Sequence, residues 1–123
     1  MEVKNIRWVG IHTRRYDEMV RFLGDVMGMR RNFEEPATVE FETTEGDEVQ
    51  VMSPGHPYFD FFSRHARGPV PLFEVDDLNQ ARQRLVEART EIVGPPGRDS
   101  NWEWLHFRAP DGHLYELSTR LPR

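Results

Sequence analysis

Three side chains in strand-like segments could carry acid–base chemistry: His12, His106 and Glu116. Imidazole changes its charge near neutral pH, and a carboxylate can accept a proton or a hydrogen bond from a ligand. These three are therefore the candidate catalytic residues. A structural role is open for each of them, because a histidine at a rim can hydrogen-bond to a neighbour and Glu116 can pair with Gln50 or a water molecule.

The tryptophans are the main candidates for ligand binding. Alternation along a strand turns every second side chain to the same face, so Trp8 shares a face with His12. Trp102 and Trp104 share a face with His106 for the same reason. Flat indole rings bind planar or cationic ligands by stacking, although any single tryptophan is more often ordinary core. Further candidate ligand-binding side chains on the same predicted surface are Gln50, Val70 and Leu72.

The elements that must position these residues occur twice in the same order. The first copy reads as a strand at 6–13, a helix from Tyr16 to Met27, and a hairpin of 37–44 and 47–53. The second copy reads as a strand at 70–77, a helix from Leu78 to Ala88, and a hairpin of 102–109 and 113–119. Apolar residues spaced by three and four indicate the helices, and period-two alternation indicates the strands. We therefore predict an α+β fold in which two tandem βαβββ modules form a curved mixed-sheet cup.

Prolines and glycines mark the boundaries of the two copies. We expect one domain over 1–123, with module one at 4–53, a linker at 54–68 and module two at 69–119. The Pro/Gly-rich stretch 94–101 is expected to form a loop that holds the additional residues of the second copy. The linker also carries an aromatic cluster, which favours a cap over one end of the core or else a lid or dimer contact. Its members are Tyr58, Phe59, Phe61 and Phe62.

Composition and charge exclude several classes of protein. Because the 123 residues include no cysteine, any metal would be held by His, Glu, Asp or Gln, and disulfides are excluded. A net charge of −5 without a long block of Lys or Arg argues against a nucleic-acid partner. No apolar run approaches the roughly 20 residues of a membrane span. We expect a soluble, cytoplasmic protein with no membrane partner.

The repeated order and three motifs resemble the vicinal oxygen chelate (VOC) superfamily, which includes glyoxalases, bleomycin-resistance proteins, fosfomycin-resistance enzymes and extradiol dioxygenases. The motifs are FLGDVMGM at 22–29, with Leu23 where the family usually has Tyr, FEVDDL at 73–78 and APDGHLYEL at 109–117. The resemblance covers nearly the whole chain. It implies a homodimer, and in metal-dependent members a metal ion held by one residue from each of four strands.

The resemblance places the four metal-ligand positions on Trp8, Gln50, Val70 and Glu116. Of these, Glu116 matches the last ligand of the family and Gln50 could also ligate, whereas an indole and an aliphatic side chain offer no lone pair. A divalent ion bound by oxygen and nitrogen needs at least about three protein ligands. We therefore expect no cofactor and no metal at the usual site. A displaced metal site would use His12 together with Gln50 and Glu116.

Two main function hypotheses follow, and the sequence leaves open whether the protein is an enzyme. The first is a small-molecule-binding protein of the glyoxalase and bleomycin-resistance kind, which holds a hydrophobic or cationic ligand in the aromatic cup. The second is a VOC-superfamily enzyme, a lyase, isomerase or dioxygenase, with a displaced metal site or metal-free acid–base chemistry. A third hypothesis is a dimeric interaction module whose cup has collapsed.

Overall fold

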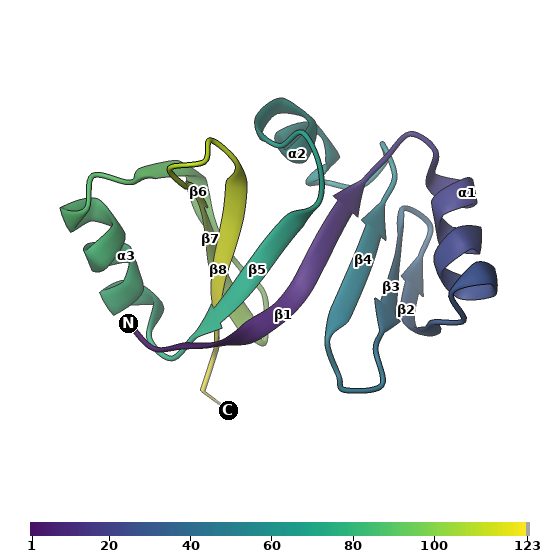
Figure 1. Cartoon of the computed structure of the whole chain (residues 1–123), viewed down its shortest axis with the longest axis horizontal. Coiled ribbons are helices and arrows are strands. Elements are labelled where there is room, and N and C mark those ends of the chain that lie inside the picture. The colour runs from purple at the N-terminus through teal and green to yellow at the C-terminus, as the bar shows by residue number, and fades with distance from the viewer. Residues whose placement is uncertain (123) are drawn as a thin grey trace. The chain divides into compact units, whose positions relative to one another are not determined.

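The computed structural model describes residues 1–122, which form two compact units (Figure 1). The first unit runs from Arg7 to Val70, and the second combines residues 1–6 with the chain from Pro71 onward. The order strand, helix and three strands occurs in both halves of the described chain. The predicted α+β class with two βαβββ modules is therefore confirmed.

The sheet of the first unit has the strand order β2-β3-β4-β1, in which β1 and β4 are parallel and the other neighbours are antiparallel. The helix α1 continues into the π-helical turn η1, where the Met27 N–H bonds to the Phe22 carbonyl at 3.0 Å. Gly28 follows with φ +69°, a conformation that ends a helix and favours glycine. The elements are β1 (Val3–His12), α1 (Tyr16–Arg21), η1 (Phe22–Val26), β2 (Arg30–Glu35), β3 (Thr38–Glu42), β4 (Glu48–Met52) and α2 (Phe59–His65).

One face of this sheet packs against α1 and η1. Val20 and Leu23 from the helical segment are buried with Val39, Phe41 and Val51 from the strands. Partly buried side chains surround them, namely Ile11, Tyr16, Met19, Met29 and Val49. Alternation along β1 and β4 then leaves Trp8, His12 and Gln50 on the opposite face.

The second unit has the strand order β5-β8-β7-β6, with β5 and β8 parallel and the others antiparallel. Asp77 caps its helix, because the Asp77 carboxylate accepts a hydrogen bond from the Gln80 N–H at 3.0 Å. The elements are β5 (Val70–Val75), α3 (Leu78–Glu87), β6 (Glu91–Arg98), β7 (Trp102–Arg108) and β8 (Leu114–Arg120).

The core of this unit lies between α3 and one face of its sheet. Leu78 and Ala81 of α3 are buried together with Val75, Leu105 and Leu117 of the strands. Partly buried side chains around them are Phe73, Leu85, Ile92 and Phe107. Because Leu105 and Phe107 face the helix, Trp104 and His106 face the other way, as the alternation of β7 predicts.

Two parts of the chain are more regular than their sequence suggests. The prediction of a loop over 94–101 is wrong for residues 94–98, which belong to β6. Within this segment Gly97 lies opposite Trp104 of β7. The prolines are tolerated because β6 is a terminal strand, bonded on one side only, and its register shifts between Val93 and Gly97. The linker contains α2, whose Phe59 and Phe62 are each 3% exposed.

Within residues 1–122, none of the helices combines the length and the apolar character needed to cross a membrane.

Candidate functional site

The face of the first sheet opposite α1, here called the Trp8 face, carries a chain of side-chain hydrogen bonds. The Trp8 indole N–H donates to Gln50 Oε1 at 3.1 Å, and Gln50 Nε2 donates to Thr38 Oγ1 at 3.0 Å. The Thr38 hydroxyl in turn donates to the Val51 carbonyl at 2.7 Å. Both ends of the Gln50 amide are therefore engaged within the protein, and the Trp8 ring is fixed at its polar atom.

The Trp8 ring lies along β1 over Gly10. A Cβ atom added at Gly10 would come within 1.9 Å of Trp8 Cη2, far closer than two carbon atoms can approach. Glycine at position 10 is therefore what allows the indole to lie flat on its own strand.

The helix α2 covers this face. Its Phe62 ring lies 6.4 Å from Trp8 and 6.1 Å from His12, and its Phe59 ring lies 6.0 Å from His12. Trp8 is only 8% exposed as a result of its packing. Two aromatic side chains of the predicted linker, Phe59 and Phe62, thus pack against Trp8 and His12.

His12 was expected either to act in acid–base chemistry or to hydrogen-bond to a neighbouring side chain. Its Nδ1 is buried and has no hydrogen-bond partner among residues 1–122. Burial lowers the pKa of His12 from its ordinary value of 6.5, because the charged imidazolium is disfavoured away from water. His12 is therefore mostly an uncharged imidazole at neutral pH.

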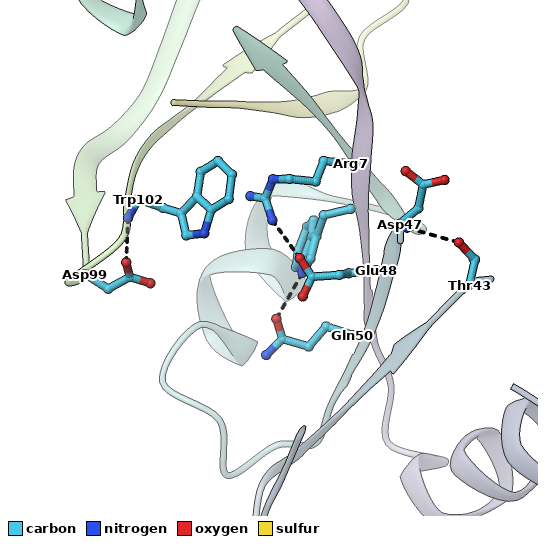
Figure 2. Close-up of polar contacts among 8 residues, drawn as sticks. Arg7, Thr43, Asp47, Glu48, Gln50, Asp99 and Trp102 are labelled. Carbon is cyan, nitrogen blue, oxygen red and sulfur yellow. Dashed lines mark hydrogen bonds and ion pairs between the residues drawn. The ribbon is translucent and has the colours of Figure 1, made fainter. Parts of the chain in front are cut away.

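An ion pair lies beside the Trp8–Gln50 bond. The Arg7 guanidinium is 2.9 Å from Glu48 Oε1, and Figure 2 shows the two side chains pointing toward each other from β1 and β4. Their side chains are only 14% and 22% exposed. This pair was not predicted from the sequence, although a basic and an acidic residue on neighbouring parallel strands are a signal for it.

The face of the second sheet opposite α3, here called the Trp104 face, holds a buried acid–base pair. His106 Nε2 and Glu116 Oε1 are 2.8 Å apart, from directly opposed positions of β7 and β8. His106 is 1% exposed and Glu116 is 7% exposed. The Glu116 carboxylate therefore bonds to His106, whereas the sequence analysis had considered Gln50 or water as its partner.

The predicted ligand-binding residues of β5 are buried. Leu72 lies opposite Glu116 in the β5–β8 register and is 2% exposed. Val70, at the start of β5, is fully buried. Of the predicted ligand-binding residues, Leu72 and Val70 are thus buried side chains of β5.

Two half-buried tryptophans continue the Trp104 face along β7. The Trp104 indole lies over Gly97 of β6, where an added Cβ would come within 2.2 Å of Nε1. The Arg120 guanidinium lies over the Trp102 ring, 4.6 Å from its centroid. The Asp99 carboxylate accepts a hydrogen bond from the Trp102 N–H at 2.7 Å and fixes the start of β7 (Figure 2).

Of the four positions expected to hold a metal, Trp8 and Val70 offer no lone pair to an ion. Trp8 and Gln50 bond to each other, Glu116 bonds to His106, and Val70 has no donor atom. Within residues 1–122 no group of three or more His, Asp or Glu side chains is arranged to hold a metal ion. The side chains at these positions do not fit the metal ion that the resemblance implies.

Comparisons with known proteins identify relatives of the whole chain. A family model of the Glyoxalase/Bleomycin resistance protein/Dioxygenase superfamily matches residues 5–117. No curated protein sequence matches the chain.

Three solved structures illustrate the structural similarity. A superfamily member from Vibrio splendidus 12B01 has a TM-score of 0.72 at 20% identity, covering 94% of this chain and 99% of its own. Methylmalonyl-CoA epimerase from Mycobacterium tuberculosis has a TM-score of 0.71 at 23% identity. The match covers 98% of this chain and 90% of the epimerase chain. The Mn(II)-bound glyoxalase from Novosphingobium aromaticivorans has a TM-score of 0.72 at 21% identity. The match covers 95% of this chain and 39% of the glyoxalase chain. At these identities the similarity establishes the fold alone.

Proposed function

The chain belongs to the Glyoxalase/Bleomycin resistance protein/Dioxygenase superfamily, and we propose that it is a small-molecule-binding member that does not use the usual metal site of that superfamily. The ligand is a hydrophobic or cationic small molecule held on the Trp104 face. The buried His106–Glu116 pair beside half-buried Trp104 is the observation that carries this proposal. In this function the protein sequesters a toxic compound or binds a metabolite in the cytoplasm, without a cofactor.

The ligand class follows from the side chains along β7 and β8. Trp104 offers an indole ring for stacking, and Glu116 offers a carboxylate that attracts a positive charge. Trp102 already binds a planar cation, since the Arg120 guanidinium lies 4.6 Å from its ring centroid. A flat cation that stacks on an indole and directs its charge toward Glu116 fits this arrangement better than an anion.

The Trp8 face is a poorer site for the same ligand. Trp8 is 8% exposed behind Phe62, and its N–H is already bonded to Gln50. We therefore assign ligand contact to Trp102 and Trp104, and a supporting role to Trp8 and Gln50.

The second candidate function is an enzyme of the same superfamily, such as a lyase, isomerase or dioxygenase. The His106–Glu116 pair favours an enzymatic function, because an imidazole and a carboxylate in hydrogen-bond contact can hold and transfer a proton. In this reading Glu116 accepts a proton from the substrate and His106 orients the carboxylate. The structural similarity to an epimerase is compatible with the isomerase class.

A titration with a matched pair of probes tests the binding function. Calorimetry would compare N-methylquinolinium, a planar cation, with quinoline, its uncharged analogue. We expect the cation to bind more tightly, and Trp104→Ala to weaken it by about 1 to 3 kcal/mol, the scale of a lost stacking partner. Trp8→Phe is the control and should bind normally, because that ring is shielded by α2. Equal binding by the Trp104 variant, or no saturable binding of either probe, would contradict the proposal.

A further inference from the structure

The turn between β7 and β8 contains the pair Asp111–Gly112, and no other Asp–Gly or Asn–Gly pair occurs in the sequence. Both residues are exposed. Such a pair is chemically labile in a flexible chain, because glycine has no side chain to keep its backbone nitrogen away from the preceding carboxyl group. The turn therefore holds a place where the backbone itself can be modified.

The modification needs only the chain and water. The Gly112 nitrogen, which gives up its proton, attacks Cγ of the protonated Asp111 carboxyl group, and the carboxyl hydroxyl leaves as water. The product is a five-membered succinimide. When water adds to the former main-chain carbonyl carbon, the bond from that carbon to nitrogen breaks and leaves an isoaspartate, in which the chain runs through Cγ. One water molecule is released and one is taken up, so the reaction requires no oxidant or cofactor.

An isoaspartate at position 111 would disturb the register that forms the candidate site. It adds one carbon atom to the backbone path of the turn, and the pairing of β7 with β8 beyond that turn places His106 opposite Glu116. Turn geometry and length fix the register of a hairpin. Protection of the turn therefore also preserves the buried pair.

Three hydrogen bonds engage the two groups that would react. Asp111 Oδ1 accepts from the His113 N–H at 3.0 Å, and Asp111 Oδ2 accepts from the Tyr115 hydroxyl at 2.5 Å. The Gly112 N–H donates to the Ala109 carbonyl at 2.9 Å. The carboxylate is thus held at both oxygens, and the nitrogen is held by the proton that it would have to lose.

The Tyr115 hydroxyl has the largest influence on the Asp111 carboxyl group. Its hydrogen bond, followed by that of the His113 N–H, lowers the pKa of Asp111 from its ordinary value of 3.8, because both bonds favour the charged form. The carboxylate is a poor electrophile, so the protonated group is the one that loses water in the first step. The bond from Tyr115 therefore reduces the fraction of molecules that can react.

The Tyr115 ring is held between two phenylalanines of the neighbouring strands. Its centroid lies 6.0 Å from that of Phe73 on β5 and 5.7 Å from that of Phe107 on β7, with interplanar angles of 15° and 20°. Both phenylalanines also pack against the core beneath α3. Stacking on both faces fixes the direction of the ring. The hydroxyl is thus positioned toward Asp111 by contacts that do not involve the turn.

We propose that Asp111–Gly112 is a latent isoaspartate site, and that the Tyr115 hydroxyl suppresses isomerisation there in the folded protein. The proposal is independent of the ligand and of any reaction at the His106–Glu116 pair.

Tyr115→Phe tests the proposal, because it keeps the stacked ring and removes only the hydroxyl. Wild type and variant would be held for weeks at neutral pH and physiological temperature, and peptide mapping with an isoaspartyl methyltransferase would measure isoaspartate at position 111. We expect the variant to accumulate it about fivefold faster, the factor that corresponds to one lost hydrogen bond. Wild type unfolded in urea gives the unprotected rate and should exceed both. A variant that matches folded wild type, or folded wild type that matches the urea sample, would overturn the proposal.

Asp99–Ser100 is an internal control in every sample. Serine permits the same reaction, and the Asp99 carboxylate accepts its hydrogen bonds from the Asn101 and Trp102 N–H groups at 2.8 Å and 2.7 Å. Isoaspartate at position 99 should therefore be the same in wild type and Tyr115→Phe. If the substitution only loosened the protein, isoaspartate would rise at both positions, and that result would overturn the role assigned to the hydroxyl.

Discussion

The imidazole Nε2 of His106 and the carboxylate Oε1 of Glu116 lie 2.8 Å apart, from opposed positions on the antiparallel strands β7 and β8. Because both side chains are buried, each depends on the other to satisfy its polar atoms. The pair therefore contributes to stability as well as to the proposed site.

Replacing one member of the pair should destabilise the protein more than replacing both. His106→Leu leaves a buried carboxylate without this donor, and we expect it to lower the free energy of unfolding by about 1 to 3 kcal/mol. The double variant His106→Leu/Glu116→Leu should recover part of that loss, since no charge is left buried. Urea denaturation of His106→Leu, Glu116→Leu and the double variant measures the coupling. Additive effects would show that the pair is not coupled.

Glu116→Gln separates the two functions proposed for the site. The amide keeps the shape and hydrogen-bonding reach of the carboxylate but has no charge and cannot take a proton. A binding protein should lose about 1 to 3 kcal/mol of affinity for a cation and little for an uncharged analogue. An enzyme should lose turnover by about 100-fold or more while it still binds substrate. A variant identical to the wild type in both assays would place the site elsewhere.

Gly10→Ala should disturb the Trp8 face although it adds a single methyl group. The added Cβ overlaps the indole, so Trp8 must move away from Gln50 and Phe62. We expect a loss of about 1 to 3 kcal/mol in the free energy of unfolding, the usual cost of overpacking. Gly68→Ala is a matched control, because an added Cβ there meets nothing within 4 Å. Thermal denaturation compares the two, and equal effects would contradict the prediction.

The partly buried histidines His12 and His56 should make stability depend on pH. Burial lowers the pKa of His12 and of His56 from the ordinary value of 6.5, so the unfolded chain binds protons that the folded protein does not. Their contribution is fully present above that value and is lost as the pH falls through the lowered pKa values. The free energy of unfolding, measured between about pH 8 and 5, should therefore decrease toward acid. His12→Phe should flatten this dependence, and an unchanged slope would show that His12 does not titrate on unfolding.

Divalent metal ions should leave thermal stability unchanged. A ligand that binds only the folded state at 100 times its dissociation constant adds about 2.7 kcal/mol to the free energy of unfolding. Nickel, zinc, manganese and iron(II) can each be tested by the melting temperature of protein purified without chelator. A shift of several degrees with one ion, or a stoichiometric metal in the purified protein, would contradict the metal-free function proposed here.

The side of the sheet on which each residue lies follows from the sequence, because alternation along a strand is strict. Leu105 and Leu117 pack with α3, and this alone turns His106 and Glu116 to the other face. Their direct contact did not follow, since it depends on the register between β7 and β8. That register is set by the turn that joins the strands, not by the pattern within either one.

The helix α2 and the strand β6 could not be read from local patterns. The α2 sequence contains three phenylalanines close to Asp60. Its packing against Trp8 and His12 involves partners about 50 positions earlier in the chain. Residues 94–98 carry two prolines and two glycines, which are typical of a loop, yet pairing with β7 makes them a strand. In both cases contacts distant in sequence decide the local structure.

The prolines of β6 also limit how the protein can assemble. Pro95 and Pro96 have no N–H groups, so the outer edge of β6 is a poor template for an added strand. Replacing these prolines with β-branched residues would restore the missing donors on a terminal strand. The Gly-Pro-Pro-Gly sequence therefore disfavours the addition of a further strand at this edge.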